Sequence, residues 1–128
     1  MAHFAKLGVG NKIERVIVIH NNDAPTEEAG QAFIKTLYPN DNSLWLQTSF
    51  NTKHGEHLLG GTPLRMNFAE AGGYYNQDLD AFIPPQYHGS WVFDETICDW
   101  VAPVEMPDDG QPYDWSEDQR KWVVRDIL

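Results

Sequence analysis

The four residues His54-Gly55-Glu56-His57 carry the side chains best suited to binding a metal ion. Two imidazoles and one carboxylate could ligate zinc, but a structural zinc site normally has four ligands and a catalytic site three, with supporting partners. The His-x-x-His spacing also differs from the helical spacing of zinc proteases. We therefore interpret the segment as a solvated polar loop and predict no metal and no cofactor. The alternative is a metal-dependent hydrolase, which would require this loop to order around zinc.

The other candidates for acid–base or nucleophilic chemistry are scattered along the chain. His3, His20 and His88 have no serine, cysteine or aspartate at a spacing typical of catalysis, so we interpret them as core or interface histidines. Cys98 is the only cysteine, which excludes an internal disulfide, and its place at a predicted hairpin turn favours a packing role. The residues therefore predict no catalytic site, and a protein that is not an enzyme.

The charge balance argues against one large class of partners. The 128 residues include 19 acidic and 9 basic side chains, which gives a formal net charge of −10. Proteins that bind nucleic acid neutralise phosphates with lysine and arginine, so we predict no nucleic-acid partner. No apolar run approaches the about 18 residues of a membrane span, and Met1–Lys6 lacks a signal-peptide pattern. We therefore predict no membrane association, and a single domain over residues 1–128.

One pattern occurs three times in the last third of the chain: an aromatic residue, a polar turn, and a second aromatic residue seven positions later. The pairs are Tyr75 and Phe82, Phe93 and Trp100, and Trp115 and Trp122. Aromatic residues favour strands, and Asn, Asp and Ser favour turns, so each copy predicts a β-hairpin with its aromatics paired across the strands. Because an isolated hairpin is marginally stable in water, we expect the copies to pack on each other or on a neighbour.

The aromatic residues of this region are also the candidates for binding a partner. Hairpins that bury their own rings would explain most of them without any partner. Tryptophan and tyrosine are also enriched in interface hot spots, so these rings, Tyr87 among them, could form a protein-docking face or a sugar-stacking face. The residues that we predict to contribute to the core and to the docking surface are Trp91, Trp100, Tyr113, Trp115 and Trp122.

The first 50 residues predict the elements that would support these hairpins. Two strands, at Phe4–Leu7 and Ile13–His20, are joined by a glycine-containing turn. The β-branched run at Ile13–Ile19 suggests a strand covered on both faces at the centre of a sheet. Thr26 has the chemistry of an N-cap for a following helix, and Ser43–Phe50 predicts a third strand. We therefore predict a small ββαβ core.

The rest of the chain divides into two parts. Residues 51–72 lack a hydrophobic period and predict a loop and a connecting strand, with extended backbone at Leu64–Ala69. Residues 73–128 contain the hairpin repeats, separated by Pro84-Pro85 and Pro103, since proline cannot donate to a central ladder. The predicted fold class is α+β: a small ββαβ core with one helix at residues 1–50, followed by a β-meander of three aromatic-rich hairpin repeats.

Several segments of the chain resemble one protein family. They are Met1–Lys6, Gln47–Thr52, Gly60–Arg65, Asn67–Ala69, Asp80–Pro85, Ser90–Val92, Trp100–Pro103, Pro107–Gly110, Tyr113–Trp115 and Trp122. In order and spacing they are similar to a family of small, mostly uncharacterised proteins from tailed phages of marine bacteria, especially cyanobacterial phages. The resemblance covers nearly the whole chain and departs from the family pattern at Met66 and at Glu70–Gly72.

This resemblance implies a virion-associated structural protein rather than an enzyme, and it supplies no catalytic residue. The expected role is that of a head decoration or cement subunit, or of a tail-accessory subunit. Such a protein would be present in multiple copies on other capsid or tail proteins, where symmetry multiplies weak contacts. The expected location is the virion, after synthesis in the host cytoplasm. The alternative from another class is a glycan- or receptor-binding module that uses exposed aromatic rings.

Overall fold

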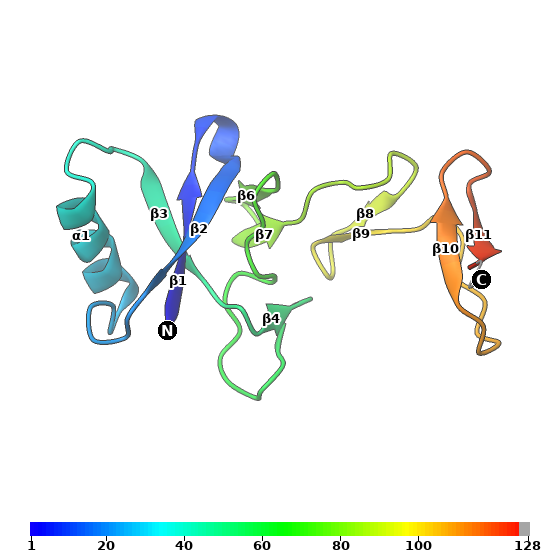
Figure 1. Ribbon diagram of the computed structural model, residues 1–128, viewed down its shortest axis with the longest axis horizontal. Coiled ribbons are helices and arrows are strands. Elements are labelled where there is room, and N and C mark those ends of the chain that lie inside the picture. Colours follow the sequence, from blue (N-terminus) through cyan, green and yellow to red (C-terminus); the bar gives the residue numbers. More distant parts are fainter. Residues whose placement is uncertain (126–128) are drawn as a thin grey trace.

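The computed structural model describes residues 1–125 and shows a mixed α+β protein with one helix and several small antiparallel hairpins. The predicted α+β class is therefore confirmed. Helix α1 (Glu27–Leu37) lies at one end of the long axis, and the hairpin of β10 (Tyr113–Ser116) and β11 (Lys121–Val124) lies at the other (Figure 1). Within the described residues, no helix is long and apolar enough to cross a membrane.

The N-terminal region contains a three-stranded antiparallel sheet in the order β2-β1-β3. Its elements are β1 (Ala2–Leu7), the short 3-10 helix η1 (Val9–Asn11), β2 (Ile13–Ile19) and β3 (Leu44–Thr48). The prediction that Ile13–Ile19 is the central strand is wrong, because β1 lies between the other two. Adjacent residues Phe4 and Ala5 of β1 are both 0% exposed, whereas Val18 of β2 is 52% exposed. The β-branched run thus indicates a strand correctly, but not the strand's position in the sheet.

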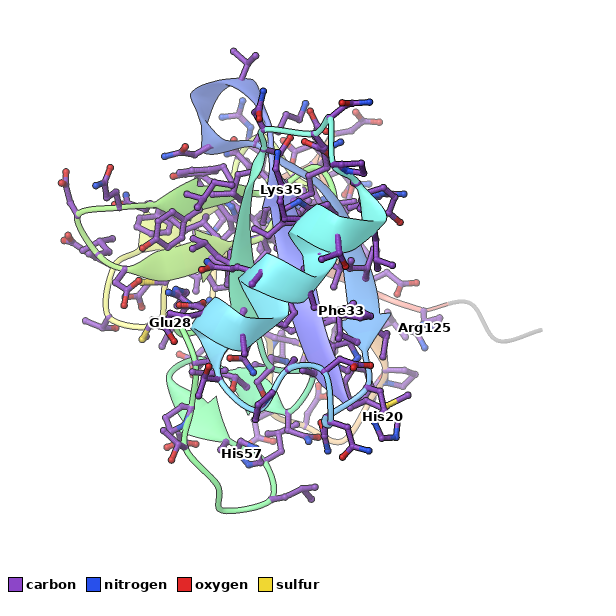
Figure 2. All side chains as sticks on the ribbon, turned by 90° about the vertical axis from the view of Figure 1, so that its left-hand side faces the viewer. His20, Glu28, Phe33, Lys35, His57 and Arg125 are labelled. Atoms are coloured by element: carbon purple, nitrogen blue, oxygen red, sulfur yellow. The ribbon has the colours of Figure 1, made fainter. Side chains whose placement is uncertain are left out.

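Helix α1 covers one face of this sheet (Figure 2). Thr26 Oγ1 accepts a hydrogen bond from Ala29 N at 3.1 Å, which confirms the predicted N-cap. A side chain at Gly30 would collide with the ring of Phe4, so glycine lets the helix approach the sheet closely. The apolar cluster between helix and sheet consists of Ala2, Phe4, Ile19, Ala24, Ile34 and Trp45.

The opposite face of the sheet is covered by the first aromatic hairpin, formed by β6 (Tyr74–Asn76) and β7 (Ala81–Ile83). Phe82 of this hairpin is fully buried against the sheet. Main-chain hydrogen bonds of 2.9 and 3.0 Å between Ile13 and residues 72–73 join the hairpin to the start of β2. The cluster on this face consists of Ala5, Leu7, Ile13, Leu46, Ala69 and Phe82.

The three predicted hairpins are present, and their aromatic residues pair as predicted. The second hairpin is formed by β8 (Val92–Asp94) and β9 (Asp99–Val101). The cross-strand partners are Tyr75 with Phe82, Phe93 with Trp100, and Trp115 with Trp122. Each hairpin is a separate two-stranded sheet, so the predicted hairpins do not join in the single sheet of a β-meander. The connections that separate them contain Pro84, Pro85 and Pro103, which lack the N–H group that a shared ladder would need.

The three hairpin turns have the same backbone form. The residue before the second strand has a positive φ in each copy: Asp80 (47°), Cys98 (53°) and Arg120 (51°). A side chain at the start of each turn accepts a hydrogen bond from an N–H within the turn: Asn76 Oδ1 from Leu79, Asp94 Oδ1 from Thr96, and Ser116 Oγ from Gln119. The sequence repeat is therefore also a repeat of backbone conformation.

The segment after β3 differs from its predicted form in two places. Where a loop was expected, β4 (Thr52–Lys53) and β5 (Glu56–His57) form a short antiparallel hairpin. Its two-residue turn has φ values of 52° at His54 and 81° at Gly55, as in a type I′ turn. The His-Gly dipeptide therefore forms the turn of a hairpin.

The connecting strand predicted at Leu64–Ala69 is not formed. Arg65 and Met66 have φ values of 49° and 69°, which are incompatible with an extended strand. Side-chain hydrogen bonds of Arg65 hold this bend in place.

Candidate functional site

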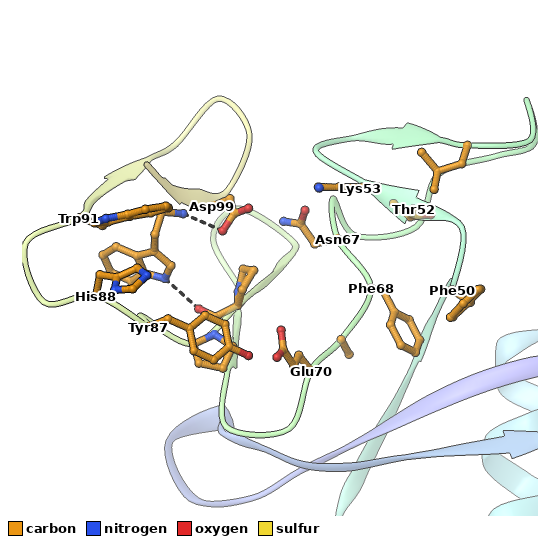
Figure 3. Close-up of a pocket in the computed structure, with 15 residues that line it drawn as sticks. Phe50, Thr52, Lys53, Asn67, Phe68, Glu70, Tyr87, His88, Trp91 and Asp99 are labelled. Carbon is orange, nitrogen blue, oxygen red and sulfur yellow. Dashed lines mark hydrogen bonds between the residues drawn. The ribbon is translucent and has the colours of Figure 1, made fainter. Parts of the chain in front are cut away.

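An aromatic groove of about 730 Å³ lies between the β4–β5 segment and the connection that leads into the second hairpin (Figure 3). Its ring-bearing residues are Phe50, Phe68, Tyr87, His88, Trp91 and Trp100. Two prolines, Pro84 and Pro85, also line it. Aromatic and apolar lining with a few polar groups is typical of binding sites for ligands and for protein partners. We refer to this cavity as the aromatic groove.

The rim of the aromatic groove is apolar and exposed. Phe50 is 67% exposed, Leu58 is 66% exposed and Tyr87 is 68% exposed. Single exposed apolar side chains are normal on a protein surface, but a group of them around a cavity marks an interaction site. The aromatic groove with its rim is therefore the candidate functional site of the chain.

Hydrogen bonds to two buried threonines hold the floor of the groove. Phe68 N donates to Thr52 O at 2.9 Å, and Ala69 N donates to Thr48 Oγ1 at 2.9 Å. The Phe68 ring meets the ring of Phe50 edge-on, with centroids 5.5 Å apart. The exposed Phe50 ring is thus supported from beneath and presented toward the groove.

The opposite wall is built from the second hairpin and the chain before it. Trp100 Nε1 donates to Pro84 O at 2.8 Å, which fixes the indole against the two prolines. His88 and Trp91 lie with ring centroids 4.8 Å apart. Tyr87 lies next to this pair at the rim of the groove (Figure 3).

Asn67 joins the two walls. Its side chain is buried, and its Nδ2 donates to Phe82 O at 3.1 Å and to Cys98 O at 2.9 Å, linking the first two hairpins. Its Oδ1 accepts from His54 N at 2.9 Å. Removing this amide would leave several buried main-chain groups without partners, so we expect Asn67 to fix the width of the groove.

Arg65 connects the groove floor to the helix and the first hairpin. Its Nη1 donates to Glu27 Oε2 at 2.6 Å and to Gln47 O at 2.9 Å, and its Nε donates to Asp80 Oδ1 at 3.2 Å. These contacts explain how the positive φ at Arg65 is maintained, because the surrounding structure holds the strained residue in place. The bend in turn directs Asn67 and Phe68 into the groove.

The polar groups of the groove are partly used by the protein itself. Asp99 Oδ2 lies 2.8 Å from His54 Nε2, and Asp99 Oδ1 accepts from Trp100 N at 2.7 Å. Lys53 and Glu70 are exposed at the groove. The groove therefore offers apolar ring surface, one ammonium group and one carboxylate to a bound molecule, which is chemistry suited to binding.

The two histidines of the candidate metal segment face different partners. His54 binds Asp99, whereas His57 Nδ1 accepts hydrogen bonds from Leu59 N at 3.1 Å and Gly61 N at 3.0 Å. Across residues 1–125, no group of three or more His, Cys, Asp and Glu side chains is placed to hold a metal ion. Cys98 is buried, and burial raises the pKa of its thiol, with Glu95 adding to the shift.

The structure separates the five aromatic residues that we predicted to bind a partner. Trp91 and Trp100 line the groove. Trp115 and Trp122 pack against each other, with centroids 5.2 Å apart, and each lies 6.0 Å from Trp91. The Tyr113 hydroxyl donates to Asp109 Oδ2 at 2.6 Å, and this bond raises the pKa of Tyr113. Three of the five thus belong to the third hairpin and not to the groove.

Glu117 attaches the third hairpin to the chain before the second. Its carboxylate accepts hydrogen bonds from Ser90 Oγ at 2.6 Å, Ser90 N at 2.9 Å and Trp115 Nε1 at 2.9 Å. The bonds from the Ser90 side chain and from the Trp115 indole hold the pKa of Glu117 below its usual range. Glu117 therefore serves as a hydrogen-bonding anchor for the tryptophan cluster.

The sequence patterns indicate Tyr87 as a candidate partner-binding ring, but not Phe50 and Leu58. Phe50 ends a predicted strand, and Leu58 lies in a segment without hydrophobic periodicity. The signal that could have found them is the presence of large apolar residues within segments otherwise rich in turn formers.

Comparison of the chain with protein-family models, with curated proteins and with solved structures found no match.

Proposed function

We propose that the chain is a non-enzymatic structural protein of a phage virion, a head decoration or cement subunit or a tail-accessory subunit. In this proposal, it docks on other virion proteins through the aromatic groove. The observation that carries the docking role is the exposed apolar rim of Phe50, Leu58 and Tyr87 around the groove. The sequence resemblance supplies the virion assignment. The division of the fold into a ββαβ core at residues 1–50 and a repeat region at residues 73–128 is part of the same proposal.

The energetics of the rim suit a docking surface. Burying a large apolar side chain completely contributes about 1.5–3 kcal/mol relative to leaving it exposed. Part of that gain is lost to the entropy cost of association, so one groove would give moderate affinity. Many copies on a symmetric particle would convert moderate affinity into firm attachment. The proposed partners are therefore capsid or tail proteins, with no nucleic acid and no membrane.

A second candidate function is the binding of a host glycan or receptor. The observation that favours it is the combination of exposed aromatic rings at Phe50 and Tyr87 with the charged side chains of Lys53 and Glu70 at the same groove. Sugar rings stack their C–H faces on aromatic side chains, and their hydroxyl groups can bond to ammonium and carboxylate groups. The two functions would use the same groove and are separated by experiment.

The decisive test is rebinding of the purified protein to phage particles stripped of accessory proteins. We expect stoichiometric binding to heads or to tails. Leu58→Ala and Tyr87→Ala should weaken it by about tenfold or more, which corresponds to about 1.4 kcal/mol. Leu37→Ala is the matched control, because Leu37 is also exposed but lies on helix α1, outside the groove.

Two outcomes would count against the virion proposal. Failure of the wild-type protein to bind stripped particles would remove it directly. Binding to host polysaccharide that is lost in Tyr87→Ala, together with failure to bind particles, would place the glycan function first.

A further inference from the structure

The two outer edges of the N-terminal sheet differ in how far other parts of the chain cover them. The outer edge of β3 is covered by side chains: Gln31 Nε2 donates to Trp45 O at 2.6 Å, and Glu27 Oε2 accepts from Gln47 N at 2.7 Å. Arg65 Nη1 also donates to Gln47 O. Bonds of this kind prevent a strand from another molecule from pairing with β3.

The outer edge of β2 is covered only at its start. Residues 72–74 pair with Lys12 and Ile13 there. From Glu14 to His20, no strand of the described chain lies beside β2, because its only sheet neighbour is β1. An exposed edge rich in β-branched residues is a template for pairing with a further strand.

The alternation of the ladder identifies the main-chain groups that face outward. Trp45 and Gln47 direct their main-chain groups away from β1, because Gln31, Glu27 and Arg65 bind them. In antiparallel sheets, successive residues direct these groups to opposite sides. Their neighbour Leu46 therefore faces β1, where its partner is Ala5.

The same alternation continues across β1. Ala5 faces β3, so Phe4 faces β2, where its partner is Ile17. Ile17 is therefore directed inward, and Val16 and Val18 direct their N–H and C=O groups outward. These two residues are the hydrogen-bonding edge that remains open.

We infer that β2 pairs antiparallel with β2 of a second copy of this chain, forming a two-fold dimer with one sheet continuous across both copies. The covered start of β2 and the bulge at Glu14 limit the pairing to Arg15–Ile19. A two-fold axis then places Ile17 opposite Ile17 of the other copy, Val16 opposite Val18, and Arg15 opposite Ile19. This arrangement is isologous, so it closes at two copies and builds no fibre.

The side chains of this stretch are self-complementary. Val18 is 52% exposed in one copy and would be covered beside Val16 of the other. Cross-strand apolar pairs of this kind stabilise antiparallel strand pairing.

Charge gives the dimer a recognisable salt dependence. Each copy carries a net charge of −10, so the two copies repel each other beyond the paired strands. Added salt screens this repulsion. The dimer should therefore become more stable as ionic strength rises, which is the opposite of a complex held by charge attraction.

The test is the mass in solution, measured by light scattering over a dilution series, for the wild-type chain and two valine-to-lysine variants. Val18→Lys places a charge on the open edge and should give a monomer. Val9→Lys adds the same charge at a residue that is 98% exposed in the β1–β2 connection, and it should remain a dimer. A monomeric wild type, or equal dissociation of both variants, would overturn the inference.

Hydrogen exchange of the wild-type protein provides a second measurement that does not depend on any variant. The amides of Val16 and Val18 should exchange more slowly as protein concentration rises, while the amide of the exposed Val9 should not respond. Concentration-independent exchange at Val16 and Val18 would also overturn the inference. Binding to virions would be unaffected by such a result, since the groove lies elsewhere.

Discussion

The first and third hairpins have the same turn and the same cross-strand aromatic pairing, but different surroundings. Ala81, Phe82 and Ile83 of the first hairpin are all buried, between the sheet and the second hairpin. In the third hairpin, no residue of β10 or β11 is buried. The local pattern of seven residues thus specifies the hairpin, and the neighbouring elements determine how firmly it is held.

This difference predicts a gradient of stability along the molecule. The first hairpin shares a core with the sheet and should unfold together with it. The third hairpin depends on the tryptophan cluster of Trp91, Trp115 and Trp122 and on the bonds of Glu117. A region with few buried contacts can open without global unfolding, so we expect the third hairpin to open separately.

The largest expected effect follows from truncating the buried aromatic residue of the first hairpin. Phe82→Ala should lower the free energy of unfolding by about 3–5 kcal/mol, because it leaves a cavity against the sheet. Urea denaturation followed by far-UV circular dichroism measures the loss. Phe50→Ala is the control, since that ring is largely exposed, and it should cost less than about 1 kcal/mol. Equal losses in the two variants would contradict the stability gradient.

A smaller and local effect is expected for the equivalent residue of the third hairpin. Trp122→Ala removes the contacts to Trp115 and Trp91 and the hydrogen bond from Trp122 Nε1 to Val104 O. The free energy of opening this hairpin should fall by about 1–3 kcal/mol. In hydrogen exchange, amides of β10 and β11 should exchange faster while those of β1 remain unchanged. Equal acceleration in β1 would mean that the two regions unfold as one unit.

Acid should loosen the third hairpin through Glu117. Because the folded-state pKa of Glu117 is lowered, its contribution is complete above the ordinary glutamate pKa of about 4.3 and is lost as pH falls through the lowered value. The Trp115 indole N–H, which donates to Glu117, provides the readout by NMR chemical shift. The resonance should move in this acidic range. In Glu117→Gln, the transition should be absent, and its persistence would assign the titration to another group.

The smallest effect concerns the turn of the third hairpin. Arg120 has a positive φ of 51°, which glycine adopts without steric strain. Arg120→Gly should therefore be neutral or stabilise the hairpin by up to about 1 kcal/mol, after the greater freedom of glycine in the unfolded chain is subtracted. Asp118→Gly in the same turn should destabilise it, because Asp118 has no positive φ to relieve. Exchange rates of the β10 and β11 amides measure both changes.

The sequence allowed prediction of features that depend on local chemistry. The Thr26 cap follows from one hydroxyl before a helical segment, and the three aromatic pairs follow from a spacing of seven residues across a polar turn. Both interactions join residues that are close together in the chain, so the residue types at those positions are enough to predict them.

Features that depend on distant contacts could not be predicted in this way. β1 is the central strand because β2 and β3 pair with its two edges, and neither pairing is visible in Ala2–Leu7 itself. The bend at Arg65 depends on Glu27, which lies far away in the chain. The groove likewise includes Phe50 and Leu58, which no local pattern indicates as binding residues.

The proline-containing connections between the hairpins also affect how such a chain can change in evolution. Each hairpin completes its own main-chain ladder, so no hairpin depends on ladder hydrogen bonds from the next. The first aromatics of successive copies, Tyr75, Phe93 and Trp115, are 18 and 22 residues apart. Duplication or deletion of one hairpin with its connection would lengthen or shorten the C-terminal region by one hairpin. The ladders of the remaining hairpins would stay intact. The C-terminal hairpin region can thus serve as a spacer whose length depends on the number of hairpins.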